Sequence, residues 1–294
     1  SFLSTAQPSV DTLSSFGTEA KLFGFDTFLD KDGKYSLGAA TGKCVFSANQ
    51  PNSGFSASGG YTFVNNFIFG PNGATLSTFS VSGINETIST SSSSATASIG
   101  GRDSSKNNTY FWAESSYKGT MSNGNLMFLV GSQQNNNNEY NSSTRIIIDP
   151  LDDPIDEALT YNLVWITDGY QTSGRVAQQK SAQLSFNTVT ASTYSVDFGT
   201  ITGEQVITPY APTIGLLETL APTTIGPVDP SAVTVADNSD TQLLVFDLTA
   251  TGLVTESFTC SISENKEQIA CSVIKNDSTT GTKAVGLALG VRKK

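Results

Sequence analysis

The densest group of side chains able to do chemistry is an acidic run near the middle of the chain. Five carboxylates fall within nine residues, namely Asp149, Asp152, Asp153, Asp156 and Glu157. Carboxylate oxygens are ligands that calcium prefers, so this run is a candidate calcium site. The same residues also suit the start of a helix, with Asp153 as N-cap and Pro154 at the first helical position. We predict a short helix over 154–159, in which capping accounts for most of the acids.

The chain contains no histidine, and this excludes several kinds of site. Ser-His-Asp and Cys-His catalytic arrangements depend on imidazole, and so do many zinc and iron centres. Three cysteines without a CxxC motif do not make a thiolate metal site. Carboxylate chemistry, a lysine nucleophile and an oxygen-ligated calcium site remain open. We predict no cofactor, with calcium as the one candidate left open.

One acid, Glu114, lies beside aromatic residues and is the best single candidate for a glycosidase acid. A glycosidase needs a second carboxylate at a defined separation, and no local motif supplies it. The aromatic residues can form a sugar-stacking platform, but strands of this kind more often place them in a core; they are Tyr110, Phe111, Trp112, Tyr117, Trp165 and Tyr170. An enzyme has no specific support here, so we predict a protein without catalytic residues.

Two of the cysteines fall in a predicted hairpin near the C-terminal end. With Asn265-Lys266 at its tip, Cys260 lies opposite Cys271, and the flanking pairs are Ile262 with Ile269, Phe258 with Val273, and Glu256 with Lys275. Directly opposed cysteines are within disulfide range. We predict a disulfide, with two buried thiols packed side by side as the alternative. Cys44 has no partner and is predicted to be a small buried apolar residue.

Four glycosylation sequons occur, at Asn85, Asn107, Asn141 and Asn276. The motif is an acceptor for glycans in secreted proteins. The chain is so rich in asparagine, serine and threonine, however, that about this number arises by chance. The sequons are therefore candidates and weak evidence for secretion.

The surface chemistry is neutral and polar. Only 14 % of residues are charged, and the net charge is −10, against about 25 % charged residues in a typical globular domain. Such a composition is common in β-rich extracellular and virus-particle proteins. The only basic run, residues 292–294, is too short for a nucleic-acid face. The sequence has no run of 18 apolar residues, so it predicts no membrane-spanning helix. The first ten residues show no signal peptide.

Strand patterns dominate the first two thirds of the chain. Residues 61–69 alternate strictly between aromatic and other side chains, and Asp32-Gly33 predicts a hairpin turn after a strand that begins at Lys21. Further strands are predicted at 75–82, 88–99, 126–130, 144–148, 161–167, 178–189, 192–198 and 205–208. At least ten strands with almost no helix indicate an antiparallel β-sandwich or jelly roll.

A proline-rich segment divides the chain. Five of the ten prolines lie within 208–230, and proline is excluded from central strands because it lacks an N–H. After it, five strand patterns at 232–236, 242–249, 253–263, 267–275 and 282–289 indicate a small Ig-like sandwich. The predicted organisation is an N-terminal arm at 1–20, a large β-sandwich domain at 21–207, a connector at 208–230 and a small Ig-like β domain at 231–294.

These features together predict a non-enzymatic structural subunit. Such a subunit self-assembles into a virus or phage particle or appendage, or into an extracellular filament. Its expected partners are copies of itself or other structural subunits, with no nucleic acid and no membrane insertion, and its expected location is the virion or the extracellular space. The alternative is a secreted carbohydrate-binding or carbohydrate-cleaving protein.

Overall fold

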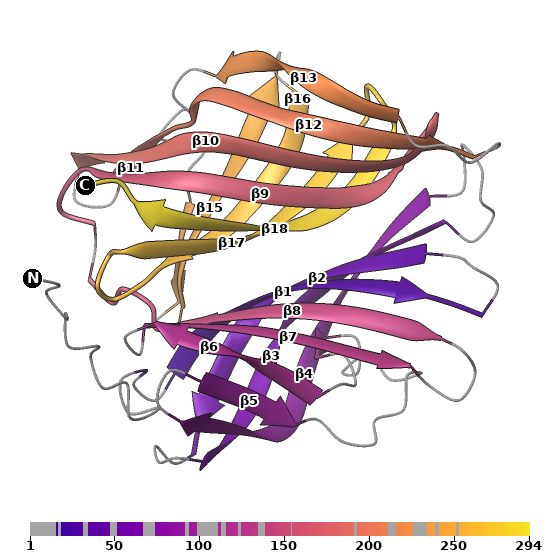
Figure 1. The fold of residues 1–294 in the computed structure, drawn as a ribbon. Coiled ribbons are helices and arrows are strands. Elements are labelled where there is room, and N and C mark those ends of the chain that lie inside the picture. Colours follow the sequence, from indigo (N-terminus) through magenta and orange to yellow (C-terminus); the bar gives the residue numbers. More distant parts are fainter. Residues whose placement is uncertain are drawn as a thin grey trace, which may run out of the picture.

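The structure is a computed structural model of the chain. It describes residues 16, 19–31, 35–47, 52–66, 74–91, 94–98, 111–112, 116–122, 125–134, 139–153, 155–190, 193–210, 216–225, 234–238, 241–250 and 253–294. These residues form an all-β protein of two sheets, one above the other in Figure 1. Among them, no helix is long and apolar enough to cross a membrane.

The first sheet is a closed barrel of eight antiparallel strands, each paired with the next and β1 paired with β8 (Figure 1). Its strands are β1 (Glu19–Leu29), β2 (Tyr35–Phe46), β3 (Asn52–Asn66), β4 (Ala74–Ser91), β5 (Ser94–Ser98), β6 (Ser116–Ser122), β7 (Leu126–Gln134) and β8 (Tyr140–Ile148). Closure removes both sheet edges, so every strand has two neighbours.

Side chains that alternate inward along these strands fill the barrel, together with Trp112 from the segment between β5 and β6. We call this group the barrel core; among its buried members are Leu22, Cys44, Phe55, Tyr61, Trp112, Tyr117, Met127, Leu129 and Ile147. Tilted ring contacts link Phe55 to Trp112 and Trp112 to Tyr117, with centroids 5.3 and 5.2 Å apart. The interior is therefore packed with aromatic and aliphatic side chains, as in other small barrels.

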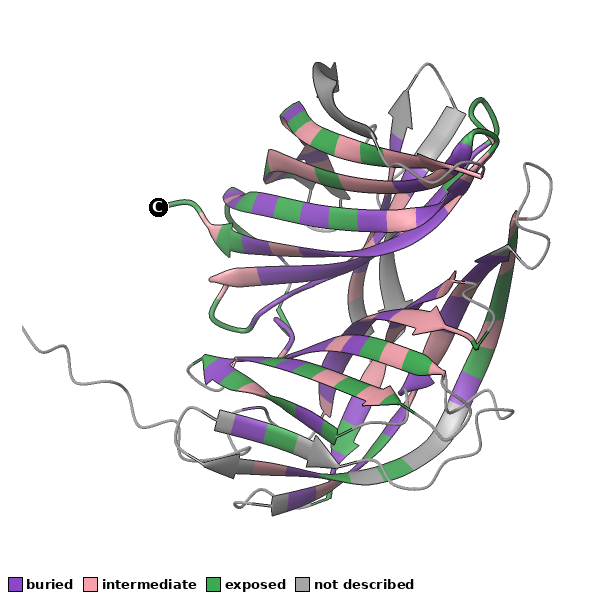
Figure 2. Ribbon diagram, turned by 45° about the vertical axis from the view of Figure 1, so that its right-hand side comes forward, coloured by how far each residue is buried: buried purple, intermediate pink, exposed green. Residues whose placement is uncertain are grey.

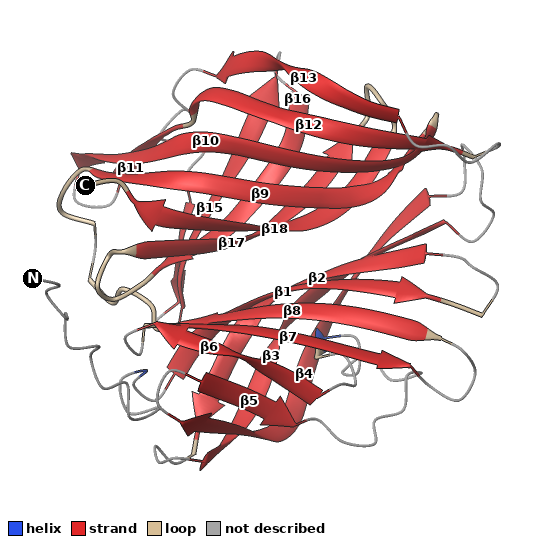
Figure 3. Cartoon of the chain, viewed as in Figure 1, coloured by secondary structure: helices blue, strands red, loops and turns tan. Residues whose placement is uncertain are grey.

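The second sheet has ten strands and stays open. They are β9 (Leu159–Gln171), β10 (Gly174–Thr190), β11 (Thr193–Asp197), β12 (Gly199–Pro209), β13 (Leu216–Ile225), β14 (Thr234–Asn238), β15 (Thr241–Ala250), β16 (Leu253–Ile262), β17 (Gln268–Asp277) and β18 (Thr282–Arg292). Their order is β13-β12-β10-β9-β18-β17-β16-β15-β14, and β11 pairs with β10. Figure 3 shows the sheet curling into a half-barrel above the closed barrel.

An aromatic core lines the inner face of the half-barrel. Trp165 meets Phe258 edge to face at 5.6 Å between centroids, and Phe258 stacks on Phe246 at 5.5 Å. Phe198 contacts all three rings. Aromatic pairs in such arrangements stabilise a core beyond the area that they bury. Leu163, Leu184 and the Cys260–Cys271 pair belong to the same cluster.

The two sheets pack through their outer faces. Phe23, Leu126, Ile146 and Ile148 of the barrel form one apolar cluster with Ala270 and Leu287 of the half-barrel, and a second cluster lies around Leu37, Tyr170 and Val285. The Tyr170 hydroxyl donates to the backbone oxygen of Tyr35 at 2.6 Å. Buried residues continue across this junction in Figure 2. Apolar contact thus fixes one sheet against the other.

The sheets divide the chain at a different point from the predicted domains. Strands β9 to β12, predicted to end a large sandwich, pair through β9 and β18 with the strands predicted to form a small Ig-like domain. The all-β prediction is confirmed, whereas a jelly roll followed by an Ig-like sandwich differs from the closed barrel and half-barrel observed. Local strand patterns do not specify which distant strands pair.

The proline-rich connector contributes a strand of its own. Residues 216–225 form β13, which pairs only with β12 among the described strands and ends the sheet. The register of this pair shifts between Ile201 and Gly203, opposite the segment that holds Pro222. An edge strand with a bulge tolerates proline because no second neighbour needs its N–H. The edge position of β13 therefore agrees with the prediction that the proline-rich segment is excluded from central strands.

Several local predictions are confirmed. Strands β1 and β2 pair antiparallel as predicted, although the predicted turn at Asp32-Gly33 lies outside the described residues, and residues 61–66 lie in β3. Residues 88–99 contribute to two paired strands, β4 and β5, instead of one.

The predicted helix at 154–159 is wrong, because the described residues there are extended or bent up to the start of β9. Leu151, Ile155 and Leu159 have helical spacing, yet all three are buried against the half-barrel core along that path.

Candidate functional site

A layer of polar side chains on the inner face of the half-barrel is the strongest candidate site. It comprises Gln178 and Lys180 of β10, Gln205 of β12, Glu256 of β16 and Lys275 of β17, and we call it the polar layer. On each strand these residues alternate with outward-facing positions and continue the row that forms the aromatic core. Charged groups in such positions are rare unless they are paired or serve a function.

Two contacts cross the inner space of the half-barrel within this layer. The Lys180 ammonium donates to Glu256 Oε2 at 3.2 Å, and the Lys275 ammonium donates to Gln178 Oε1 at 3.0 Å. Both contacts join β10 to strands that are not its neighbours in the sheet. The layer therefore ties the two walls of the half-barrel together.

Partners on other strands of the same sheet orient these groups. Trp165 Nε1 donates to Glu256 Oε1 at 3.4 Å, so the carboxylate has contacts through both oxygens. Gln178 Nε2 donates to Gln205 Oε1 at 2.9 Å, which turns the Gln178 oxygen toward Lys275. Among the described residues, Lys275 has no carboxylate within ion-pair distance, although Glu256 lies directly opposite it on the neighbouring strand.

Burial and the neighbouring ammonium of Lys180 lower the pKa of Lys275, and this exceeds the opposite influence of Glu256 and Asp277. The Asp277 carboxylate is held elsewhere, because it accepts from the backbone N–H of Thr279 at 2.9 Å. Burial opposes its ionisation, but hydrogen bonds from the 279–280 turn and the charge of Lys275 hold the pKa of Asp277 below its usual value. The layer thus contains one amine that ionises less readily than a surface lysine.

A second charged cluster lies in the barrel core and is completely buried. Arg145 contacts both oxygens of Asp26, at 2.6 and 2.9 Å, and donates to the backbone oxygen of Phe111 at 2.7 Å. Tyr61 also donates to Asp26 at 2.8 Å. Burial alone would lower the pKa of Arg145, but Asp26 more than offsets it and the pKa is raised.

Glycines make room for this cluster. A Cβ atom at Gly38 would collide with the Tyr61 ring, and one at Gly24 would lie 2.8 Å from Arg145 Nη1. Arg145 and Asp26 are both without solvent exposure. We interpret the bidentate pair as structural, because its hydrogen bonds serve to compensate two buried charges.

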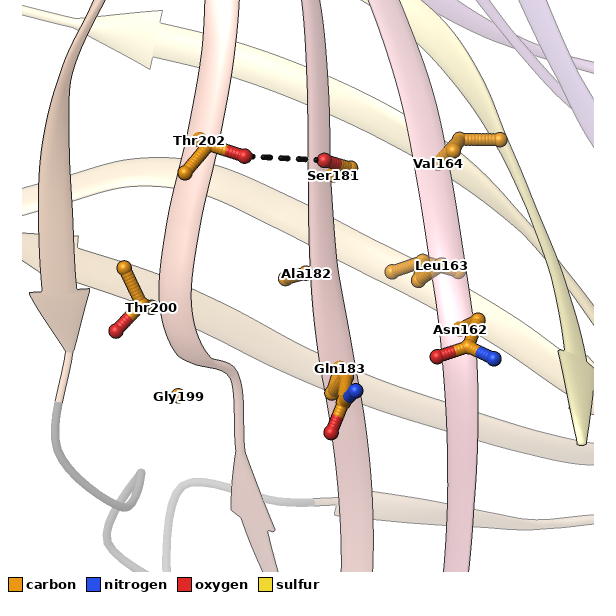
Figure 4. A pocket seen from close by; sticks show the side chains of 9 residues that line it. All are labelled: Asn162, Leu163, Val164, Ser181, Ala182, Gln183, Gly199, Thr200 and Thr202. Atoms are coloured by element: carbon orange, nitrogen blue, oxygen red, sulfur yellow. Dashed lines mark hydrogen bonds between the residues drawn. The ribbon is translucent and has the colours of Figure 1, made fainter. Parts of the chain in front are cut away.

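A depression of about 530 Å³ lies where β12 separates from β10. The two strands pair as far as Ser181 and Thr202, whose hydroxyls are 3.2 Å apart (Figure 4). Beyond that point β12 leaves β10 and continues, paired with β13, toward Gly199, which has a positive φ of 56°. The lining is uncharged and consists of Asn162, Leu163, Val164, Ser181, Ala182, Gln183, Gly199, Thr200 and Thr202. It can accept a neutral group but offers no chemistry.

Exposed apolar side chains flank the junction of the two sheets on both sides. On the barrel they are Phe128 and Val130 of β7; on the half-barrel they are Val164 and Ile166 of β9 and Val291 of β18, with 37 to 56 % of each exposed. Phe128 is paired with buried Ile146, and Ile166 with buried Leu287. The five residues, which we call the exposed strip, therefore extend the apolar junction onto the surface.

The acidic run does not converge on one point. Asp156 and Glu157 bind Lys266 at 3.2 and 2.9 Å, and Glu157 also binds Arg292. Asp149 lies apart, half-buried near Glu264 and Asp152, and burial followed by these two carboxylates raises its pKa to about 7. Within the described ranges no three potential ligands gather to hold a metal ion. Calcium binding by Asp149, Asp152, Asp153, Asp156 and Glu157 is therefore not supported by their positions.

The other predicted site residues are scattered. Tyr110, Glu114 and Asn107 lie outside the described residues. The remaining aromatic candidates are buried and in separate clusters, with Phe111, Trp112 and Tyr117 in the barrel, Trp165 in the half-barrel and Tyr170 at the junction. Asn85 and Asn276 are exposed, and Asn141 is half-buried in β8. The predicted core location of the described aromatic residues is confirmed.

The predicted hairpin register is confirmed in full. Strands β16 and β17 pair Glu256 with Lys275, Phe258 with Val273, Cys260 with Cys271 and Ile262 with Ile269. The structure joins Cys260 and Cys271 by a disulfide between Cα atoms 4.0 Å apart. Cys44 is buried and free, and burial raises the pKa of its thiol.

Sequence reasoning missed the polar layer, although one signal was present. Glu256 and Lys275 fall on the inward row of the predicted hairpin, together with Phe258 and Val273. Charged residues in an inward row indicate a buried pair or a site. Their contacts with β10 could not be foreseen, because nothing local places β10 across from β16 and β17.

No family model and no curated protein matches the sequence. Two solved structures are similar along nearly the whole chain. One is a protein of Nitrosomonas europaea provisionally named AttH, with 8 % identity, 93 % of this chain and 92 % of that chain covered, and a TM-score of 0.23. The other, from Nostoc punctiforme, has unknown function and belongs to the DUF3598 family, with 8 % identity, coverage of 96 and 98 %, and a TM-score of 0.21. Likenesses of this size carry no argument about this chain.

Proposed function

We propose that the protein is a non-enzymatic structural subunit that associates with copies of itself through the exposed strip. The observation that carries the proposal is the continuity of the strip with the junction between the two sheets. Apolar patches that extend beyond a buried interface are typical of surfaces that another protein covers. A particle, an appendage or a filament is the kind of assembly that this subunit would build.

The chemistry of the strip favours a second copy of this chain. All five side chains are aliphatic or aromatic, and they lie on strands of both sheets that flank the junction (Figure 1). Nucleic acid would require clustered basic residues, whereas the chain carries a net charge of −10. A sugar would favour exposed aromatic platforms, and the described candidates for one are buried. The carbohydrate hypothesis therefore stays the alternative.

Light scattering coupled to size exclusion tests the proposal. We expect the 30.9 kDa chain to show a mass that rises with concentration. Replacing Val164 and Ile166 together by threonine keeps the β-branched shape but adds hydroxyl groups to the strip. The double variant should raise the dissociation constant about tenfold, equivalent to ~1.4 kcal/mol.

Val206→Thr is the matched control, because Val206 is 37 % exposed on β12 and is not part of the strip. It should assemble like the original chain. A mass of one chain at every concentration would overturn self-association. If a monomeric chain were also retained on immobilised glycans, the carbohydrate alternative would replace it.

A further inference from the structure

The polar layer lies on the inner face of the half-barrel, whereas the proposed self-association uses outer faces. Its most unusual member is Lys275, which is only 8 % exposed. Its ammonium has a single neutral acceptor, Gln178 Oε1, and no carboxylate in contact among the described residues. A buried lysine without a contacting counter-ion is costly for a protein, so a ligand or a reaction is a reason to keep it.

Burial and the Lys180 ammonium favour the neutral form of Lys275, and the two nearby carboxylates that oppose them, Glu256 and Asp277, are engaged by other groups. The Lys180 ammonium, and not that of Lys275, contacts Glu256 Oε2 at 3.2 Å. Trp165 donates to the other oxygen of the same carboxylate. Asp277 is occupied by the 279–280 turn. On the side of the aromatic core, Val273 and Phe258 occupy the next inward positions of β17 and β16. Desolvation beside a second cation is the arrangement that turns lysine into a nucleophile.

We propose that Lys275 is a reactive amine that forms an imine with a small aldehyde or ketone. The neutral amine adds to the carbonyl carbon, and one amine proton moves to the oxygen to give a carbinolamine. Loss of water then removes that oxygen together with the second amine proton and leaves a C=N bond. The ammonium of Lys180, within the same layer, is placed to assist the departure of water as a proton donor. No oxidant or further reactant is needed.

Reductive labelling provides the test. The full-length protein is treated at pH 7 with a low concentration of propanal and cyanoborohydride, and each lysine is followed by peptide mass spectrometry. Lys294 is the internal reference, because its side chain is 82 % exposed. We expect Lys275 to be labelled about tenfold faster than Lys294, because a desolvated amine beside a second cation is neutral in a larger fraction of molecules. Greater exposure cannot explain such a preference. Labelling of Lys275 no faster than Lys294 would overturn the proposal.

Two variants separate reactivity from accessibility. Lys180→Met removes the neighbouring cation and frees Glu256 to pair with Lys275, so the labelling rate at Lys275 should fall about tenfold. Lys283→Met is the matched control, because Lys283 lies on adjacent β18 and binds Asn276; it should leave the rate unchanged. Circular dichroism verifies that both variants are folded. An unchanged rate in folded Lys180→Met would contradict the role assigned to the layer. Neither result depends on self-association, so the two proposals can fail separately.

Discussion

The closed barrel and the half-barrel are built from strands of similar length but treat buried charge differently. In the barrel, closure seals the interior, and Arg145 and Asp26 pair through two hydrogen bonds at 0 % exposure. In the half-barrel, the sheet order leaves β13 and β14 as its ends, and the charged layer remains in partial contact with solvent. In the closed barrel the charged side chains thus serve to hold the interior together, whereas in the open sheet they remain available for binding or reaction.

The same difference explains why the barrel offers no candidate site among its described residues. Within the Arg145 cluster, Arg145 donates to Asp26 and to the backbone oxygen of Phe111, and Tyr61 donates to Asp26. Removing either member of the Asp26–Arg145 pair would leave the other charge buried and unpaired. The polar layer can exchange partners instead, because Lys275 is held by one neutral contact.

The largest expected effect comes from cutting the chain within 208–230. If residues 231–294 were a separate domain, proteolysis there would release them as a stable fragment. Ten residue pairs between β9 and β18 predict instead that the nicked pieces stay together under native conditions and separate only in denaturant. Size exclusion of the nicked protein measures this. Release of a folded C-terminal fragment without denaturant would restore the predicted domain boundary.

The next largest effect is predicted for the buried pair of the barrel. Asp26→Ala leaves Arg145 charged and unpaired, which should lower the free energy of unfolding by about 3–5 kcal/mol in urea titrations. Asp168→Ala is the matched control, because its pair with Arg175 is partly exposed and should lose at most about 1 kcal/mol. Equal losses in the two variants would show that closure does not set the energetic weight of the pair.

The disulfide tests whether the two sheets unfold separately. Cys260→Ala with Cys271→Ala removes a cross-link between strands of the half-barrel, and should lower its stability by about 2–3 kcal/mol in the loop-entropy account. A second, barrel-specific transition should keep its midpoint. Non-reducing peptide mapping of the original chain should find Cys260 linked to Cys271 and Cys44 free. Alkylation of all three cysteines without reduction would contradict the linkage.

A smaller effect is expected at the segment that connects the sheets. The pKa of Asp149 is raised to about 7 from a reference of 3.8, so the unfolded chain loses this proton at lower pH than the folded chain. Stability should therefore fall as the pH rises from about 4 to 7, by about 1–2 kcal/mol after allowance for the half-exposed position.

Asp149→Asn should remove that fall and make the protein more stable at pH 8 than the original chain. Asp153→Asn, at an exposed position, is the control and should leave the pH dependence in place. Thermal unfolding between pH 4 and 8 measures both. An identical pH dependence in the original chain and Asp149→Asn would rule out this carboxyl as its source.

The sequence could predict features that depend only on strands adjacent in the chain. The register of β16 with β17 follows from one tip and alternating side chains, and it predicts every pair correctly. Barrel closure could not be predicted, because the pairing of β1 with β8 has no local signal. The helix predicted at 154–159 failed because tertiary packing of Ile155 outweighed local capping preferences. Predicting the candidate site requires both the local register and the pairing of distant strands. Glu256 and Lys275 lie opposite each other in one hairpin, whereas Lys180 comes from β10, which is distant in the sequence.

The position of β18 has a consequence for the synthesis of the protein. This strand comes after all its neighbours in the chain, yet it lies between β9 and β17 and pairs Tyr161 with Arg292. The barrel can complete its hydrogen bonding as soon as β8 leaves the ribosome. In the half-barrel, β9 remains unpaired on one side until β18 has been translated. Completion of the half-barrel therefore depends on a pairing between segments distant in sequence, which is slow to form, and the half-finished sheet is the stage at which the nascent chain most needs protection from aggregation.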